Sequence, residues 1–317
     1  MSSASNIAIN VEPKQIALLL GGWSPERDVS LVSGRECGKA LRALGHQVTE
    51  IDVGRDLAQR LGEVQPDLCF NALHGVGGED GEVQGVLELL EIPYTHSGVG
   101  ASAIAMDKIR SKVLFANAGI PVTSDLLLTR ESAALDTNNH PMDRPYVIKP
   151  VNQGSSVGIT IVHDLSEKRP TCLNPDQWDF GEVVMIETYI PGRELTCGVM
   201  GKNIFEVLEI TTKSAFYDYS AKYDLGGSAH QVPAEIPDDV KQAIREYSAV
   251  AHSVIGCRGV TRTDFRYDAD GIGIIALEIN TQPGMTPVSL IPEMAAATGV
   301  GFEQLVQWLV EDASCQR

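Results

Sequence analysis

The first hundred residues alternate between short apolar runs and amphipathic stretches. The continuous apolar run 15–20 (QIALLL) ends at Gly21-Gly22, a pattern typical of a buried parallel strand. Apolar residues recur on one face of 30–44, which predicts a helix. Further strands are expected over 46–53 and 67–73, and further helices over 57–64 and 82–92. Because strands that alternate with helices form parallel sheets, this region is predicted to be a parallel α/β unit with ligand loops beyond its strand ends.

The pattern changes after a helix predicted over 99–118, which ends at the helix-stop sequence 119–121 (GIP). Closely spaced strands are predicted over 145–150, 158–162, 183–190, 195–200 and 204–210. They leave no room for long helices between them, which indicates a mixed or antiparallel sheet. Residues 212–233 have few apolar runs and predict a long surface loop, which in a compact domain is usually functional. The remaining expected elements are a helix over 238–255, strands over 261–268 and 273–280, and a helix near 301–310.

Composition limits the class of protein. The 317 residues include 25 basic and 42 acidic side chains, a formal charge of −17, with no basic tract. This balance argues against nucleic-acid and anionic-membrane partners. The amino-terminal stretch lacks the apolar segment of a signal peptide, no apolar run is long enough to span a bilayer, and the six cysteines have no zinc-like spacing. We expect a cytoplasmic protein of two or three packed units, with most cysteines acting as small buried hydrophobes.

Two familiar nucleotide-binding signatures do not apply. Residues 98–103 spell GxGxxA, but no clear buried strand precedes them, so we interpret them as helix-packing residues rather than as an NAD site. No GxxxxGK[ST] motif occurs, which excludes a P-loop NTPase.

A glycine- and serine-rich loop, residues 152–158, follows Lys149 at the end of an apolar strand. Such a loop can present backbone N–H groups and hydroxyls to phosphate oxygens, and Lys149 adds a positive charge. Taken alone, the same residues also fit an ordinary β-hairpin with an edge lysine. A second signal is needed to choose between these interpretations.

That second signal is a set of polar residues in the last two predicted strands. Glu278 and Asn280 are two residues apart in one strand, so both side chains point to the same face. With Asp264 on an adjacent strand they form an all-oxygen site suited to Mg²⁺, and Arg262 shares a face with Asp264. A solvated polar face is the alternative. However, a carboxylate inside an apolar strand is costly unless it is paired or liganded, so the metal site is favoured.

These signals resemble the ATP-grasp superfamily, and within it the chain is similar to D-alanine–D-alanine ligases over nearly its whole length. The resemblance rests on LLGGWSPERDVSLVSG, ALHGVGGEDG, the helix with MDKIRSK, KPVNQGSSVG, FYDYSAKY and LEINTQPGMTPVSLIP, in this order. It implies an α/β ATP-grasp fold. A parallel α/β domain (1–97) would precede two α+β subdomains (98–186 and 187–317) that clasp ATP.

The resemblance also implies a reaction. ATP would phosphorylate the carboxylate of one D-alanine, and the amine of a second would attack the acyl phosphate. The products would be D-alanyl-D-alanine for peptidoglycan precursors, ADP and phosphate. Two Mg²⁺ or Mn²⁺ ions would assist, and the family suggests a homodimer. ATP and D-alanine are thus the expected partners.

The catalytic set implied by the resemblance centres on one carboxylate. Glu26 would hold the ammonium group of the first D-alanine, and Ser155 and Tyr223 would form a hydrogen-bond network with it. Arg262 and the backbone N–H of Gly284 would stabilise the tetrahedral oxyanion, as charge arranged in advance where charge develops.

The remaining implied residues bind substrates and cofactors. Those of the substrate subsites are Val29, Ser30, His74, Lys222, Ser289 and Leu290. Those that contact ATP phosphates are Lys108, Lys149, Ser155 and Ser156. Those that hold the adenosine are Glu187, Tyr189, Ile190 and Glu194. The metal ligands are Asp264, Glu278 and Asn280.

Without the resemblance, several of these residues have simpler interpretations. Glu26 could cap the helix predicted near residue 30, because acids favour helix N-termini. His74 could be a packed loop histidine, the loop tyrosines could be anchors, and Lys222 could be a solvated charge. The agreement of six motifs favours the functional roles.

The chain departs from the family pattern at a few positions. Thr188 stands where relatives often place a basic residue beside the adenine, and Ser220 replaces a common acid. The segment after Tyr223 also looks short. Neither substitution removes a residue needed for the chemistry.

Two other functions remain open. The first is another ATP-grasp carboxylate–amine ligase or a depsipeptide ligase, although Tyr223 argues against the latter. The second is a non-catalytic nucleotide-binding paralogue, which would be expected to lack some of the residues present here, namely Lys149, Arg262, Asp264, Glu278 and Asn280.

Overall fold

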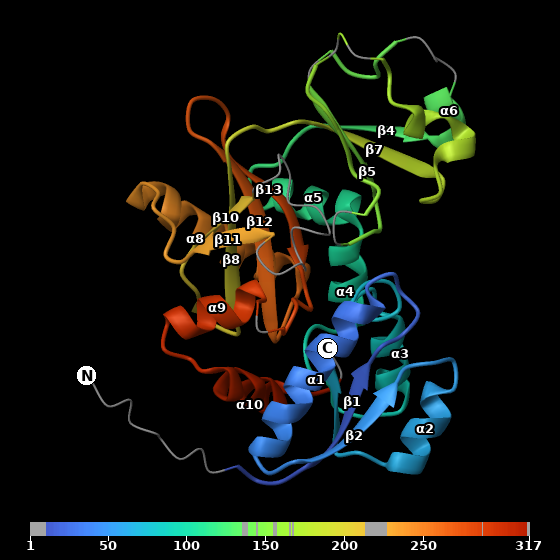
Figure 1. The fold of residues 1–317 in the computed structure, drawn as a ribbon, viewed down its shortest axis with the longest axis vertical. Coiled ribbons are helices and arrows are strands. Elements are labelled where there is room, and N and C mark those ends of the chain that lie inside the picture. The colour runs from blue at the N-terminus through green and yellow to red at the C-terminus, as the bar shows by residue number, and fades with distance from the viewer. Residues whose placement is uncertain are drawn as a thin grey trace.

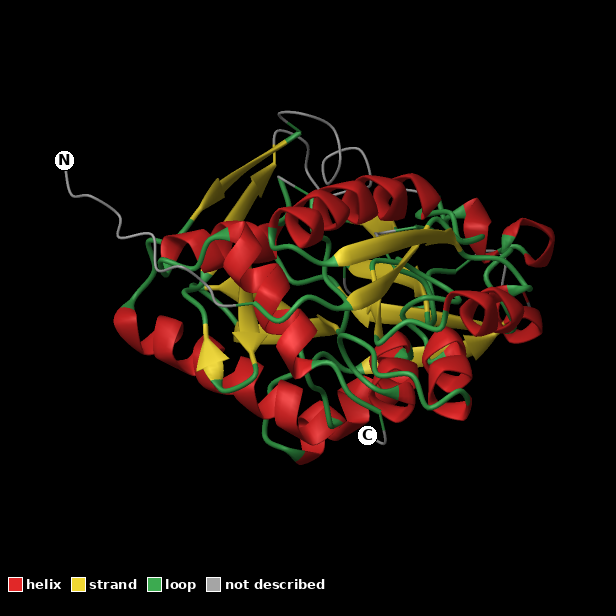
Figure 2. Ribbon diagram, turned by 90° about the horizontal axis from the view of Figure 1, so that it is seen from below, coloured by secondary structure: helices red, strands yellow, loops and turns green. Residues whose placement is uncertain are grey.

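Three sheets make up the strand content that the computed structural model describes (Figure 1). The described residues are 11–134, 139–143, 145–154, 157–164, 166, 168–212, 227–286 and 288–315. In Figure 1 a parallel sheet with its helices lies at one end, a six-stranded sheet lies in the middle, and a four-stranded sheet lies at the far end. Figure 2 shows most helices on the outside, with the strands between them.

The first sheet is parallel, as predicted, with the order β2-β1-β3. Its strands are β1 Gln15–Leu20, β2 Gln47–Asp52 and β3 Leu68–Asn71. Its helices are α1 Arg27–Ala43, α2 Leu57–Val64 and α3 Glu82–Leu89. Five of the six β1 residues are buried because β1 is the central strand and is covered by helices, which explains its unbroken apolar sequence.

Helix α1 begins three residues before the predicted start at residue 30. Val29 is the one apolar residue of its first turn, which is too little for apolar periodicity to reveal the start. Arg27, the first residue of the helix, donates to Asp52 Oδ1 at 2.7 Å and to the carbonyl of Gly22 at 2.9 Å. These contacts tie the start of α1 to the end of β2 and place Glu26 at the N-cap position.

The prediction of one helix over 99–118 was wrong, because two helices occupy this stretch. They are α4 Val99–Met106 and α5 Lys108–Asn117. Asp107 between them is extended (φ −87°, ψ 101°), and its carboxylate accepts hydrogen bonds from the backbone N–H groups of Ile109 and Arg110. An aspartate N-cap stabilises a helix start, so α5 begins anew at Lys108. Residues 98–103 form the start of α4, as the helix-packing interpretation expected.

The other two sheets are antiparallel, which agrees with the prediction. The six-stranded sheet has the order β11-β10-β8-β12-β13, with β9 paired to β8. Its strands are β8 Arg193–Met200, β9 Asn203–Ile204, β10 Leu208–Thr212, β11 Ser228–Gln231, β12 Val260–Asp268 and β13 Gly273–Asn280. The four-stranded sheet has the order β4-β7-β5-β6, from β4 Asp125–Thr129, β5 Tyr146–Pro150, β6 Thr160–Val162 and β7 Val183–Thr188.

The two remaining predicted helices are confirmed and pack in different places. Helix α8 Asp238–Ile255 shares an apolar core with the six-stranded sheet. Helix α10 Phe302–Asp312 returns to the parallel sheet and packs against α1, where Leu305 and Leu309 join Cys37 and Leu41 in one core. The end of the chain therefore closes the first unit (Figure 1).

Some short elements escaped prediction. They are β4, β11, α6 Arg130–Ala134, α9 Leu290–Ala297, and the 3-10 turns η1 Thr171–Leu173 and η2 Pro175–Gln177. In α9, Pro292 lies in the first turn, where its missing N–H costs little. Strand β11 occupies part of the predicted loop 212–233 because its edge pairing with β10 needs no apolar run. Residues 213–226 of that loop lie outside the described residues.

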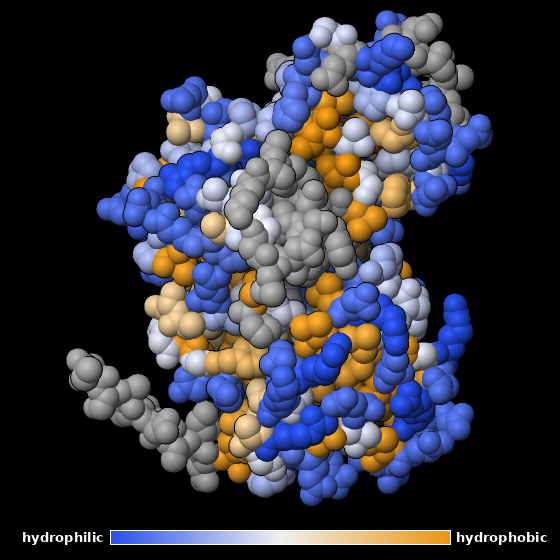
Figure 3. Space-filling model, viewed as in Figure 1, coloured by the Kyte–Doolittle hydropathy of each residue, from blue (hydrophilic) through white to orange (hydrophobic). Residues whose placement is uncertain are grey.

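The surface agrees with the composition. Figure 3 shows a largely hydrophilic face, with apolar side chains both beside the notch at the four-stranded sheet and between the polar residues of the parallel α/β unit. All six cysteines are free thiols, of which Cys37, Cys69 and Cys197 are buried. None of the helices within the described ranges has the length and apolar character needed to cross a membrane.

Candidate active site

Two cavities are lined by most of the predicted site residues that the structure describes. The first, about 870 Å³, is the Glu26 cavity. Among the residues that line it are Glu26, His74, Glu79, Lys108, Arg262, Glu278, Asn280, Gly284, Ser289 and Leu290. The second, about 820 Å³, is the Lys149 cavity. Among the residues that line it are Lys108, Thr123, Lys149, Glu187, Thr188, Tyr189, Ile190, Glu194, Asp264, Arg266 and Glu278. Lys108 and Glu278 line both, so the cavities adjoin.

Glu26 is a wall residue of its cavity rather than a helix cap. It occupies the N-cap position of α1, but its side chain makes no capping hydrogen bond. Two glycines make room for its carboxylate. A Cβ at Gly75 would lie 2.5 Å from Glu26 Oε2, and a Cβ at Gly154 would lie 3.0 Å from the same atom. Gly75 also has a positive φ of 73°, which glycine adopts most readily.

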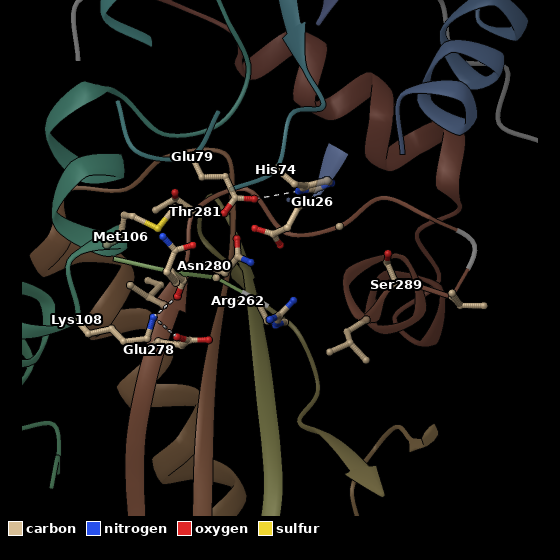
Figure 4. A pocket seen from close by; sticks show the side chains of 17 residues that line it. Glu26, His74, Glu79, Met106, Lys108, Arg262, Glu278, Asn280, Thr281 and Ser289 are labelled. Atoms are coloured by element: carbon tan, nitrogen blue, oxygen red, sulfur yellow. Dashed lines mark hydrogen bonds and ion pairs between the residues drawn. The ribbon is translucent and has the colours of Figure 1, made fainter. Parts of the chain in front are cut away.

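His74 is held at both ring nitrogens. Nδ1 lies 2.9 Å from Glu79 Oε1, and Nε2 lies 3.0 Å from Ser33 Oγ. Ser33 Oγ also accepts the backbone N–H of Met285, the residue after Gly284, at 3.3 Å. With neutral His74, the carboxylate fixes the proton on Nδ1, so Nε2 accepts the Ser33 hydroxyl. A chain of hydrogen bonds thus joins α1, the His74 loop and the Gly284 turn. Figure 4 shows the contact between His74 and Glu79.

Glu79 and Ser33 were not among the predicted site residues. Glu79 lies five residues after His74 in the same glycine-rich loop, and this proximity could have indicated it. Ser33 has no local signal, because its partners lie 41 and 252 residues away along the chain. Only the folded structure brings it to the site.

The predicted alignment of polar residues on β12 and β13 is confirmed. Arg262 is paired in register with Asn280, and Asp264 with Glu278, so the four side chains share one face of the sheet. The Arg262 guanidinium donates two hydrogen bonds of 2.8 Å to the carboxylate of Asp264. Lys108 Nζ lies 3.0 Å from Glu278 Oε2. Both acids are thus paired with cations, as expected for partly buried charges.

Figure 4 shows how these groups face the Glu26 cavity. The side chains of Glu26, Asn280 and Arg262 point toward one another across it, and Lys108 and Glu278 lie at its border. Across the part of the chain that the structure describes, no three His, Cys, Asp or Glu residues form a group able to hold a metal ion. The predicted set has two carboxylates and one amide, so this observation does not bear on it.

The Lys149 cavity combines cations with an apolar wall. Val147, Ile159, Ile161 and Leu277 supply apolar surface, while Lys149 is almost fully buried beside Glu187. Such a wall suits a flat aromatic ring, with the lysines placed for attached phosphates.

The segment after β7, which borders the Lys149 cavity, is braced by Arg266. The Arg266 guanidinium donates to the carbonyl of Ile190 at 3.1 Å and lies 3.4 Å from Glu194. It also lies 6.0 Å from the ring centre of Tyr189, a cation–π contact. The predicted adenosine residues Tyr189, Ile190 and Glu194 are therefore all contacted by the Arg266 side chain. Thr188, one of the positions at which the chain departs from the family pattern, lines the same cavity.

Some predicted residues lie elsewhere. Val29 and Ser30 are buried in the first turns of α1. The Ser30 hydroxyl accepts the N–H of Gly21 at 2.9 Å and donates to the carbonyl of Ala72 at 2.8 Å, and so braces the loop at the end of β1. The predictions for Ser155, Ser156, Lys222 and Tyr223, and the departure at Ser220, lie outside the described residues.

Two antiparallel sheets that enclose a lysine-bearing cavity, next to a parallel α/β unit, define the ATP-grasp class of ligases. Family models agree with this class: "D-ala D-ala ligase N-terminus" matches residues 56–97, and "D-ala D-ala ligase C-terminus" matches residues 114–311. The D-alanine–D-alanine ligase of Parvibaculum lavamentivorans is 54% identical over 309 residues, 96% of this chain and 99% of the relative. The chain belongs to the D-alanine–D-alanine ligase family.

Solved structures of the family have the same fold. The D-alanine–D-alanine ligase from Bacillus anthracis complexed with ATP has a TM-score of 0.79 at 29% identity, covering 94% of this chain and 97% of that one. The VanG D-Ala:D-Ser ligase from Enterococcus faecalis has a TM-score of 0.76 at 29% identity, covering 95% of this chain and 99% of that one. The names of these two neighbours differ in the second amino acid that is joined, D-alanine in one and D-serine in the other.

Proposed function

We propose that this protein uses ATP to join two D-alanine molecules into D-alanyl-D-alanine for peptidoglycan precursors, through an acyl phosphate. The observation that carries the proposal is the junction of the two cavities at Lys108 and Glu278. A nucleotide in the Lys149 cavity would present its terminal phosphate there, beside a carboxylate bound in the Glu26 cavity. Family membership at high identity supports the same reaction.

The nucleotide half of the reaction is assigned to the Lys149 cavity. The adenine would lie on the apolar wall, and Lys108 and Lys149 would neutralise phosphate oxygens. Lys108 is suited to this because α5 begins with it and holds its ammonium between Glu278 and the carbonyl of Gln153, 2.7 Å away. Its position at the junction is the one that a transferred phosphoryl group requires.

Asp264, Glu278 and Asn280 fit a divalent cation by their chemistry. Two carboxylates and an amide on one face of paired strands are oxygen donors of the kind that Mg²⁺ and Mn²⁺ take beside phosphates. When bound, the two proposed ions neutralise phosphate charge. A cation bound at Asp264 would take the place of the Arg262 guanidinium on that carboxylate, and the guanidinium would then turn toward the oxyanion.

The amino-acid half is assigned to the Glu26 cavity. Glu26 would bind the ammonium of the first D-alanine, and Arg262 with the N–H of Gly284 would stabilise the oxyanion of the tetrahedral intermediate. The acceptor would lie near Ser289 and Leu290, at the N-terminus of α9. A helix N-terminus attracts a carboxylate, which orients the acceptor with its amine toward the acyl phosphate.

The test is phosphate release from ATP with D-alanine, L-alanine, D-lactate or D-serine as substrates. We expect release with D-alanine and a dipeptide product, and little with L-alanine. Efficient use of D-serine or D-lactate as acceptor would favour the second candidate, a ligase with another acceptor, which the likeness to the D-Ala:D-Ser ligase makes worth testing. We also expect a cytoplasmic homodimer, which light scattering and cell fractionation would check.

A further inference from the structure

Behind the wall of the Lys149 cavity, a cluster of four charged side chains joins α5 to the four-stranded sheet. This Lys112 cluster consists of Lys112 on α5, Asp125 on β4, Lys149 on β5 and Glu187 on β7, with Thr123 between them. The Lys112 ammonium donates to Thr123 Oγ1 at 2.7 Å and pairs with both Asp125 and Glu187. The Lys149 ammonium pairs with the other oxygen of Glu187.

Three of the four charged side chains are almost fully buried, and the formal charges balance. The side chains of Lys112, Glu187 and Lys149 are 3%, 4% and 7% exposed, and that of Asp125, at the edge of the cluster, is 19% exposed. Burial alone would raise the pKa of Glu187, but the ammonium groups of Lys149 and Lys112 lower that pKa to about 2. Glu187 is therefore ionised. Burial raises the pKa of the Asp125 carboxyl, and the Lys112 ammonium opposes this rise. With both carboxylates ionised, the two lysines offset them.

Both carboxylate oxygens of Glu187 are engaged by this cluster. Oε1 accepts from Lys112 and from Thr123, the latter at 3.2 Å, and Oε2 pairs with Lys149. Lys149, Thr123 and Glu187 line the cavity, whereas Lys112 lies behind them. Glu187 on its own would neutralise Lys149. Because Lys112 shares Glu187, more of the positive charge of Lys149 is available to the cavity.

We propose that Lys112 is a positioning residue that controls nucleotide affinity by setting the net charge behind the phosphate-binding lysine. It touches no substrate and acts through Glu187 on Lys149. The inference rests on the proposed function only in requiring an adenine nucleotide in the Lys149 cavity. It predicts that affinity follows the charge of the cluster, whichever residue changes that charge.

The experiment measures ADP binding by calorimetry, without amino acids, for four proteins. Lys112→Met leaves the cluster at −1, Asp125→Asn at +1, and the double variant at neutrality, like the wild type. One unit of charge near the phosphates, at an effective dielectric constant of about 20, should weaken ADP binding by roughly ten- to fifty-fold in Lys112→Met. Asp125→Asn should bind ADP several-fold more tightly than the wild type, and the double variant should bind ADP more tightly than Lys112→Met by a similar factor.

Kinetics and controls separate this role from a structural one. With ATP and D-alanine, Lys112→Met should raise the KM for ATP by a larger factor than it lowers kcat, and Lys112→Arg should restore most of the affinity. Lys39→Met removes one positive charge from the exposed face of α1 and should leave ADP binding unchanged. Thermal melts of every variant report folding. If Lys112→Met fails to fold, the tighter ADP binding expected of Asp125→Asn still tests whether affinity rises as the cluster becomes more positive.

Several outcomes would overturn the proposal. One is wild-type ADP affinity in Lys112→Met, and another is a double variant that binds as weakly as Lys112→Met. Weaker binding by a folded Asp125→Asn would also contradict it. If the turnover assay shows that the enzyme joins a different acid and amine, the proposed D-alanine chemistry is wrong, but the expected order of ADP affinities among the variants still holds. A wild type that binds no adenine nucleotide would overturn both.

Discussion

The Glu26 cavity and the Lys149 cavity are nearly equal in volume and share two residues, yet they hold their polar groups differently. Around Glu26, directional hydrogen bonds link Ser33, His74 and the turn at Gly284, which come from distant parts of the chain. Around Lys149, buried ion pairs between neighbouring elements dominate. The difference matches the proposed ligands, a small amino acid that must be oriented and a polyanion that must be attracted.

The two cavities should respond differently to changes in geometry and in charge. A hydrogen bond weakens steeply when its angle or length changes, so the Glu26 cavity depends on the backbone positions of three segments. Coulomb interactions fall off slowly with distance, so the Lys149 cavity depends on how many charges are present more than on their orientation. Perturbations of geometry should therefore damage the first cavity, and perturbations of charge the second.

The largest effect is expected where the cavities meet. Glu278→Gln removes the partner of Lys108 and a proposed metal ligand, so it should reduce turnover by at least about a hundred-fold while the thermal melt is retained. Glu303→Gln in the first turn of α10 is the control. Activity like that of the wild type in Glu278→Gln would remove this residue from the junction.

Gly75→Ala should break the Glu26 cavity alone. Its Cβ would lie 2.5 Å from the Glu26 carboxylate, and alanine is strained at a φ of 73°. We expect the KM for D-alanine to rise by roughly ten- to thirty-fold, with ADP affinity unchanged. Gly119→Ala is a matched control, because its φ is also positive (80°) but nothing lies within 4 Å of the new Cβ. Equal effects in both variants would mean that backbone strain, not the clash, is responsible.

Ser33→Ala should loosen the same cavity through its hydrogen bonds. Removing one hydroxyl leaves His74 Nε2 and the Met285 N–H without this partner in a buried site, which costs about 1–3 kcal/mol. We expect kcat to fall by about ten-fold and the KM for ATP to stay constant. Ser248→Ala, equally buried but bonded within its own helix α8, is the control. A rise in the KM for ATP without loss of kcat would contradict the link to the Gly284 turn.

The smallest effect should come from salt. Raising the ionic strength from roughly 0.05 M to 0.5 M shortens the screening length and should weaken ADP binding by a few-fold. The KM for D-alanine, a zwitterion held by hydrogen bonds, should change by less than about two-fold. Equal salt dependence of the two constants would remove the distinction between the cavities.

Much of the fold follows from local patterns in the sequence. The apolar run of β1, the periodicity of α2 and α8, and the strands β12 and β13 were predicted close to their observed bounds. Periods of two and 3.6 residues reflect which face of a strand or helix is buried, so they can be read without the tertiary structure. The shared face of Glu278 and Asn280 followed from the same rule.

Polar boundaries were less predictable. The break at Asp107 and the mostly polar start of α1 interrupt no apolar period, and the edge strand β11 depends on its pairing with β10. The motifs indicated which residues belong to the site, but not how each is held. Glu187 illustrates this. The resemblance implied a place in the adenosine site, and the structure adds that its carboxylate oxygens are held by Lys112, Thr123 and Lys149.

The sequence by itself thus determined the order of most elements and the identity of the motif residues. It also determined that side chains two residues apart on one strand face the same side of the sheet. Only the tertiary structure decided that Ser33 joins His74 to the Gly284 turn and that Lys112 shares Glu187 with Lys149. The physical reason is the separation of the contacting residues along the chain. Periodicity records burial within one element, whereas these contacts join residues 38 to 252 positions apart and form only when separate elements pack together.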